Sequence, residues 1–128
     1  RPSAHNNLGL SFFEHGEFDE ALVHYKKAIE LEPSSVHHNN RGLAYFHFDK
    51  LEEAKKDFEE AIRIDRTEKK QDPTIHFNLG NVYLNWKGDK NFEKALECYD
   101  MALDLHKNTA TTQGNGIVKV HHSKGLAK

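Results

Sequence analysis

The chain has 128 residues, 37% of them hydrophobic, which is enough for one domain with a modest core. Its formal net charge is −2 with both signs interleaved, no apolar run approaches the ~18 residues that span a bilayer, and no signal peptide is recognisable, so nucleic-acid and membrane partners are not expected. The single cysteine, Cys98, excludes a disulfide framework and favours a reducing, cytoplasmic location.

Two sequence blocks recur three times along the chain. The first has a glycine followed three residues later by an aromatic residue, and it spans residues 5–12, 38–45 and 76–83. The second has an alanine, an aromatic residue and an alanine at spacings of four and three, and it spans residues 21–28, 54–61 and 95–102. Both spacings place these side chains on one side of a helix. The pattern predicts three antiparallel helix pairs, in repeats of about 2–34, 35–66 and 73–107.

A glycine inside each predicted first helix indicates close packing. Gly costs about 1 kcal/mol relative to Ala in a helix, so a close approach between helices has to offset this cost. We expect the aromatic residue one turn later to pack against the alanine-aromatic-alanine stripe of the second helix. The glycines and these aromatic residues are Gly9 with Phe12, Gly42 with Tyr45, and Gly80 with Tyr83.

Turn residues mark the boundaries of the repeats in chain order. Pro33 ends the first repeat, Ser34 and Ser35 are candidate caps for the next helix, and Asp72 before Pro73 predicts the start of the third repeat. We also predict an enlarged turn at residues 87–91 and a loop at residues 108–116, where Thr and Gly are frequent. Residues 120–127 echo residues 36–44, which indicates the start of a fourth repeat or a capping helix at 117–128.

These motifs resemble the tetratricopeptide repeat, whose pattern is W-x-x-L-G-x-x-Y, then A-x-x-x-F, A and a later P. The resemblance covers residues 3–107, with His5, His38 and His76 in place of the Trp and Arg41 in place of a Leu. It implies an all-α fold, a right-handed superhelical solenoid of antiparallel helix pairs, in a single domain over residues 1–128. It also implies a protein-binding scaffold.

The sequence offers no pattern for catalysis, a cofactor or a metal ion. No two of the ten histidines lie three or four residues apart, the spacing that places two ligands on one helix face. The carboxylates alternate with lysines as on a solvated helix face, and Gly114 and Gly116 do not form a phosphate loop. We therefore expect no enzyme activity, no cofactor and no metal site.

One asparagine in each repeat provides the functional hypothesis. Asn7, Asn40 and Asn78 lie two residues before the glycine, about 200° around the helix from the contact within the pair. The resemblance implies that this face lines a concave groove, and a carboxamide can pair with both the N–H and the C=O of an extended peptide. The other residues expected along this groove are Asn6, Leu10, Phe13, Asn39, Leu43, Phe46, His47, Phe77, Asn81 and Asn85.

Two interpretations of the asparagines stay open, namely peptide binding in the groove and bonds to neighbouring helices that only tighten the stack. The series resembles the asparagine ladders in the tetratricopeptide arms of a glycosyltransferase and of a kinesin light chain. It does not resemble the carboxylate clamp by which co-chaperones of this family bind acidic chaperone tails. The clamp has basic residues at several positions where this chain has Asn6, Thr74 and Asn78, so an acidic tail is disfavoured.

Two other roles also stay open. Because the chain starts at Arg1 and ends within a repeated pattern, we expect a piece of a longer protein, and it can be the substrate-targeting arm of a larger enzyme. Alternatively the repeats serve architecture, and the apolar face at an open end of the solenoid pairs with another copy.

Overall fold

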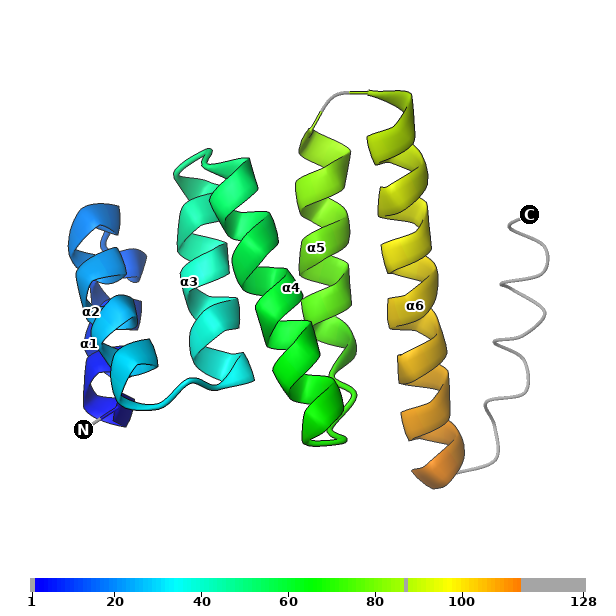
Figure 1. Cartoon of the computed structure of the whole chain (residues 1–128), viewed down its shortest axis with the longest axis horizontal. Helices are drawn as coiled ribbons and strands as arrows, with labels where there is room; N and C mark the ends of the chain where they lie inside the picture. Colours follow the sequence, from blue (N-terminus) through cyan, green and yellow to red (C-terminus); the bar gives the residue numbers. More distant parts are fainter. Residues whose placement is uncertain (1, 87, 114–128) are drawn as a thin grey trace.

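The computed structural model describes residues 2–86 and 88–113, and it is built from helices (Figure 1). No strand occurs within these residues, which confirms the all-α class. The six helices are α1 (Pro2–Glu14), α2 (Phe18–Leu31), α3 (Ser35–His47), α4 (Leu51–Thr67), α5 (Pro73–Asn85) and α6 (Asp89–Gln113).

The helices pack as three consecutive pairs. Each of α1, α3 and α5 packs mainly against the helix that follows it, and α3 and α5 also pack against the preceding α2 and α4. The pairs stand in a row in chain order, so the first and last pairs lie at opposite ends of the molecule (Figure 1). Contacts restricted to neighbouring repeats define a solenoid, and the predicted right-handed solenoid of antiparallel helix pairs is confirmed.

The glycine in each first helix allows the second helix of the pair to approach closely. A Cβ atom added at Gly42 would lie 2.7 Å from the ring of Phe58, and the corresponding distances are 2.6 Å at Gly9 and 2.7 Å at Gly80. The predicted close approach is thus present. The ring that occupies the space belongs to the second helix, however, whereas the sequence analysis assigned the tight contact to the aromatic residue of the first helix.

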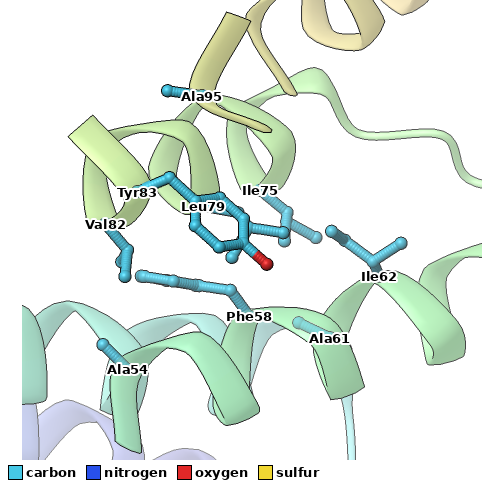
Figure 2. Close-up of a cluster of buried hydrophobic side chains, with 9 residues drawn as sticks. All are labelled: Ala54, Phe58, Ala61, Ile62, Ile75, Leu79, Val82, Tyr83 and Ala95. Atoms are coloured by element: carbon cyan, nitrogen blue, oxygen red, sulfur yellow. The ribbon is translucent and has the colours of Figure 1, made fainter. Parts of the chain in front are cut away.

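The largest cluster of buried apolar side chains joins the second and third pairs (Figure 2). Phe58 of α4 is fully buried at its centre, with Leu79 and Val82 of α5 above it. At one side Ile75 of α5 points toward Ile62 of α4, and these side chains are only 2% and 8% exposed. The contact between α4 and α5 therefore holds successive repeats together.

Two predicted helix starts are confirmed by their caps. The hydroxyl of Ser34 accepts a hydrogen bond from the backbone N–H of His37 at 3.1 Å. The carboxylate of Asp72 accepts one from the N–H of Thr74 at 2.9 Å, and Pro73 occupies the first turn of α5. Each cap satisfies a backbone donor that the first turn leaves without a helical partner.

Two predicted irregular segments are shorter than expected. The predicted enlarged turn at 87–91 is wrong, because α6 already begins at Asp89 and only residues 86–88 separate it from α5. The extra residues instead add about one turn to the start of α6, after Gly88, whose φ of +132° suits glycine alone. The predicted loop at 108–116 is wrong over 108–113, since no Gly or Pro interrupts α6 before Gly114. The predicted fourth repeat at 117–128 lies outside the described residues.

Candidate functional site

The predicted site residues all lie on the first helices of the three pairs. Direct contacts join α1 to α3 and α3 to α5, so these three helices form one face of the solenoid. Residues 6, 7, 10 and 13 come from α1, residues 39, 40, 43, 46 and 47 from α3, and residues 77, 78, 81 and 85 from α5.

Asparagine side chains bridge neighbouring helices on this face. Asn40 donates from Nδ2 to Oδ1 of Asn6 at 2.9 Å, and Asn78 donates from Nδ2 to Oδ1 of Asn39, also at 2.9 Å. In each bridge the donor stands two residues before the glycine of its own repeat. The acceptor stands three residues before the glycine of the preceding repeat. We call Asn6, Asn40, Asn39 and Asn78 the asparagine ladder. It corresponds to the bonds between neighbouring helices that the sequence analysis weighed as one of two roles for these residues.

The ladder leaves much of its hydrogen-bonding capacity unused. A carboxamide has two N–H donors and an oxygen with two lone pairs, and each bridge uses one donor and one lone pair. Asn6, Asn39 and Asn40 are partly exposed, whereas Asn78 is 9% exposed and offers the least surface. Asn7 is exposed and makes no bridge to another side chain within the described helices. Among the ladder residues and Asn7, the accessible carboxamides therefore lie on α1 and α3.

Apolar side chains flank the ladder. Leu10 of α1 is 41% exposed and Phe77 of α5 is 51% exposed. Leu43 and Phe46 of α3 are partly buried and pack against the core that joins the second and third pairs. Phe13 is likewise partly buried and packs against the core that joins the first and second pairs. The face thus combines polar carboxamides with accessible apolar surface.

The remaining predicted residues line the far end of this face, near the turns within the repeats. The ring of His47 meets that of Phe13 edge-on with 5.2 Å between centroids, and it meets that of Phe46 at 5.7 Å. On α5, Asn85 donates to the backbone carbonyl of Asn81 at 2.8 Å, and the side-chain oxygen of Asn81 accepts from the hydroxyl of Tyr99. Asn81 and Asn85 are thereby held by contacts within the third repeat.

The face carries no cluster of formal charge. None of the predicted site residues is Lys, Arg, Asp or Glu. The clamp positions on α1, α3 and α5 hold Asn6, Leu10, Asn40, Thr74 and Asn78. Such a surface favours a ligand that offers backbone amides and apolar side chains over one that carries several carboxylates.

An ionic network that the sequence pattern did not predict lies on the opposite side of α3. The carboxylate of Asp57 is 4% exposed and accepts hydrogen bonds from Arg41 Nε at 2.7 Å and Nη2 at 2.9 Å. His38 Nδ1 lies 2.9 Å from Oδ1 of the same carboxylate. The hydrogen bond to Asp57 raises the pKa of Arg41. Two departures from the repeat pattern could have predicted this network. One is Arg41 in place of Leu on α3, and the other is an Asp within the apolar stripe of α4.

Two other titratable groups are held neutral by burial. Desolvation lowers the pKa of His76, which is 7% exposed on α5. Burial, reinforced by Glu97 and Glu59, raises the pKa of the Cys98 thiol to about 11. A protonated thiol is a poor nucleophile at neutral pH, so Cys98 lacks the character of a catalytic cysteine. In the described part of the chain, no three His, Cys, Asp or Glu side chains are grouped as metal ligands.

A row of helix hairpins with a polar and apolar face along its first helices defines a helical-repeat protein. The family model of the tetratricopeptide repeat matches residues 2–35 and 36–68, which together make up just over half of the chain. The chain belongs to the tetratricopeptide-repeat family. No helix in the described residues is both long and apolar enough to cross a membrane.

Solved structures of this family share the fold. The first TPR domain of Spaghetti (RPAP3) bound to the HSP90 peptide SRMEEVD is 25% identical, with a TM-score of 0.75 over 99% of this chain and 94% of that one. The first TPR domain of human RPAP3 is 25% identical, with a TM-score of 0.74 over 99% and 97%. The TPR2AB domain of yeast Sti1 in its pHSP90 complex is 23% identical, with a TM-score of 0.74 over 98% and 47%. The comparison with curated proteins found no match.

Proposed function

We propose that this chain is a non-catalytic scaffold that binds an extended segment of a partner protein along the face formed by α1, α3 and α5. The observation that carries the proposal is the asparagine ladder, whose carboxamides are fixed in orientation by one bond each and keep further donors and acceptors. A fixed carboxamide loses less conformational entropy when it binds a peptide than a freely rotating one does. Peptide binding by structural relatives, such as the first TPR domain of Spaghetti with SRMEEVD, supports the choice of a peptide ligand.

The peptide we propose is neutral or mixed in charge. Co-chaperone clamps hold acidic peptides with lysine and arginine, and this face has carboxamides, Thr74 and Leu10 at those positions. Neighbouring helices lie ~8–10 Å apart and an extended chain advances ~3.3 Å per residue, so one ladder step corresponds to about three peptide residues. Side chains between those contacts would meet Leu10, Leu43 or Phe77. Affinity should then depend weakly on salt.

The test separates peptide binding from stacking. Peptides are selected from a random 12-residue library on the chain, and their affinity is measured by isothermal titration alongside a thermal melt of each variant. Asn7 makes no bridge, so Asn7→Ala should weaken binding three- to tenfold and leave the melting temperature unchanged. Asn6→Asp keeps an acceptor for Asn40 and removes the amide donors, so it should also weaken binding. Lys26→Ala, an exposed change on α2, is the control.

The proposal is contradicted if the selected peptides bind the parent, Asn7→Ala and Asn6→Asp with the same affinity. If Asn40→Ala then lowers the melting temperature without changing affinity, the asparagines act in stacking alone. Binding should show no competition by nucleic acid or by lipid vesicles, since we propose a protein partner in the cytoplasm.

The targeting arm of a larger enzyme is a second role compatible with this binding face. In this role the bound partner would be a substrate of the enzyme, whereas in the scaffold it would be a component of an assembly.

A further inference from the structure

The only cysteine and the only methionine of the chain lie on one face of α6. Cys98 and Met101 are three residues apart, the spacing that places two side chains next to each other on a helix. Cys98 is partly buried, and Met101 is 40% exposed. The two sulfur atoms of the chain are therefore presented together, on the side of α6 that faces α4 and α5.

Both side chains line a cavity of about 560 Å³ between α4, α5 and α6. Ile62 of α4 and Leu79 of α5, which are labelled in Figure 2, form part of its apolar wall. His76 of α5 lines the same cavity. The cavity thus brings a thiol, a thioether and an imidazole to one place, from two helices.

The imidazole of His76 is buried without a partner. The residue is 7% exposed, and its ring makes no hydrogen bond within the described residues. Buried polar side chains normally have a partner, so an unpaired one indicates room for a ligand. No fully buried side-chain nitrogen lacks a partner in the described part of the chain. The ring nitrogens of His76 are therefore not sealed in apolar packing and keep access to the cavity that the ring lines.

The other helix pairs show that the positions of His76 and Cys98 face each other. In the second pair His38 Nδ1 lies 2.9 Å from Oδ1 of Asp57, and in the first pair the Nδ1 atoms of the two corresponding histidines lie 3.3 Å apart. A Cβ atom added at the glycine of the third pair would lie 2.7 Å from the facing aromatic ring, as in the second pair. The third pair thus keeps the same register, and His76 and Cys98 lie opposite each other.

The position of Met101 is also close to the histidine. Glu60 stands at the corresponding position of the second pair, two residues after the aromatic ring. The pKa of Glu60 is lowered mainly by its hydrogen bond to Arg63 and further by the charge of His38, so these two positions are electrostatically coupled. Met101 has a flexible side chain with a polarizable sulfur, which can turn toward His76.

These three donors favour a soft monovalent cation. A zinc site needs three or four ligands from His, Cys, Asp and Glu, and no three of these side chains are so grouped in the described residues. Copper(I) instead accepts thiolate and thioether sulfur together with imidazole. Glu59 and Glu97 also line the cavity, and Arg63 and Arg66 balance their charge, so a monovalent ion suits it better than a divalent one.

We propose that Cys98, Met101 and His76 form a binding site for copper(I). Cys98 binds as the thiolate, and the proton that leaves its sulfur passes to water, so the charge of the ion is neutralised. Met101 and His76 supply the other two donors as neutral groups. The spacing of histidines within single helices could not predict this site, because its ligands come from two helices and one of them is a methionine. The proposal does not depend on peptide binding by the ladder face.

Anaerobic titration of the metal-free chain with copper(I) tests the site, with bicinchoninate as the competing chelator. We expect one copper(I) per chain. Cys98→Ser should weaken binding at least about 100-fold, and Met101→Leu, which conserves side-chain volume, should weaken it about tenfold. His5→Gln is the matched control, since it changes the histidine at the same position of the first repeat and should leave the affinity unchanged.

The single methionine provides a second measurement. Met101 gives the only methionine methyl signal in a ¹H–¹³C spectrum, and one equivalent of silver(I), a redox-inert analogue of copper(I), should shift it. X-ray absorption of the copper-loaded chain should show two sulfur neighbours and one nitrogen neighbour. Circular dichroism and thermal melts of the metal-free variants establish that each keeps the parent fold.

Three outcomes would overturn the proposal. Equal affinity in the parent and in Met101→Leu, with an unmoved methyl signal, would mean that the thiolate holds copper(I) without the thioether. A complex of two chains per copper ion would mean that Cys98 bridges chains instead of completing a site within one. Zinc(II) bound as tightly as copper(I) would contradict a soft ligand set.

Discussion

Removal of the Asp57 carboxylate should be among the most destabilising single changes in the second repeat. Asp57→Ala leaves the guanidinium of Arg41 without its two hydrogen bonds and His38 without its acceptor. Breaking a buried pair by loss of one partner costs about 3–5 kcal/mol. The Arg41 side chain is 22% exposed, so water can partly replace the lost hydrogen bonds and the cost is reduced. We therefore expect a loss of about 2–4 kcal/mol in the free energy of unfolding.

The measurement is urea unfolding followed by circular dichroism, with a matched charge removal on the same helix as the control. Glu60 pairs with Arg63 at the surface of α4, so Glu60→Ala should change the midpoint little. A second comparison comes from the chain itself, because the third repeat has Leu79 and Cys98 where the second has Arg41 and Asp57. Arg41→Leu with Asp57→Cys removes both charges and should be less destabilising than Asp57→Ala alone.

Equal urea midpoints for Asp57→Ala and Glu60→Ala would refute a stabilising role of the buried pair. The same conclusion would follow if the double replacement costs as much as the sum of Arg41→Leu and Asp57→Cys measured singly, since the cost would then not arise from an unpaired charge.

Three further predictions concern the core, the buried His76 and the partly buried Cys98. Ala61→Glu places a carboxylate at a fully buried position and should cost about 3–5 kcal/mol, and a thermal melt equal to that of the parent would show that the packing register is wrong. Burial lowers the pKa of His76 below its ordinary 6.5, so the unfolded chain takes up a proton there before the folded chain does. Stability should be greatest above about pH 6.5 and decline as the pH falls toward the folded pKa, and His76→Gln should make urea midpoints between pH 7 and pH 5 depend less on pH. Because the pKa of Cys98 is raised to about 11, iodoacetamide at pH 8 should label it slowly in the folded chain and rapidly in urea, and equal rates would contradict its burial.

Much of the fold could be predicted because local spacing and packing give the same result. A glycine in each first helix and an aromatic residue in each second helix recur in every repeat, as Gly42 and Phe58 do in the second, and they indicate which helix faces meet. Ser34 and Asp72 mark helix starts through hydrogen bonds to residues two or three positions away. The start of α6 was missed because Asp89 and Asn91 are weak helix formers and Gly88 is typical of a turn. The helix nevertheless begins there, and the backbone N–H of Phe92 donates a hydrogen bond to the carbonyl of Gly88 at 3.1 Å.

The candidate site was predicted in outline, since α1, α3 and α5 carry its residues on one face. Its hydrogen bonds could not be predicted, because a bridge such as Asn78 to Asn39 depends on how far one repeat is rotated and shifted against the next. An error of one helical turn in the predicted alignment of the repeats would leave the Asn78 side chain in solvent. The network of Asp57 escaped prediction for a related reason, since its partners lie 16 and 19 residues away along the chain.

The two bridges of the asparagine ladder use different residues of the second repeat, Asn40 toward the preceding repeat and Asn39 toward the following one. The second repeat therefore supplies both the donor and the acceptor that a bridge requires. If a tandem duplication copied residues 35–66, the new border would bring Asn39 of the first copy against Asn40 of the second, and the bridge would form there without any further mutation. Such a solenoid can lengthen at its middle by gene duplication while each border keeps its polar bond.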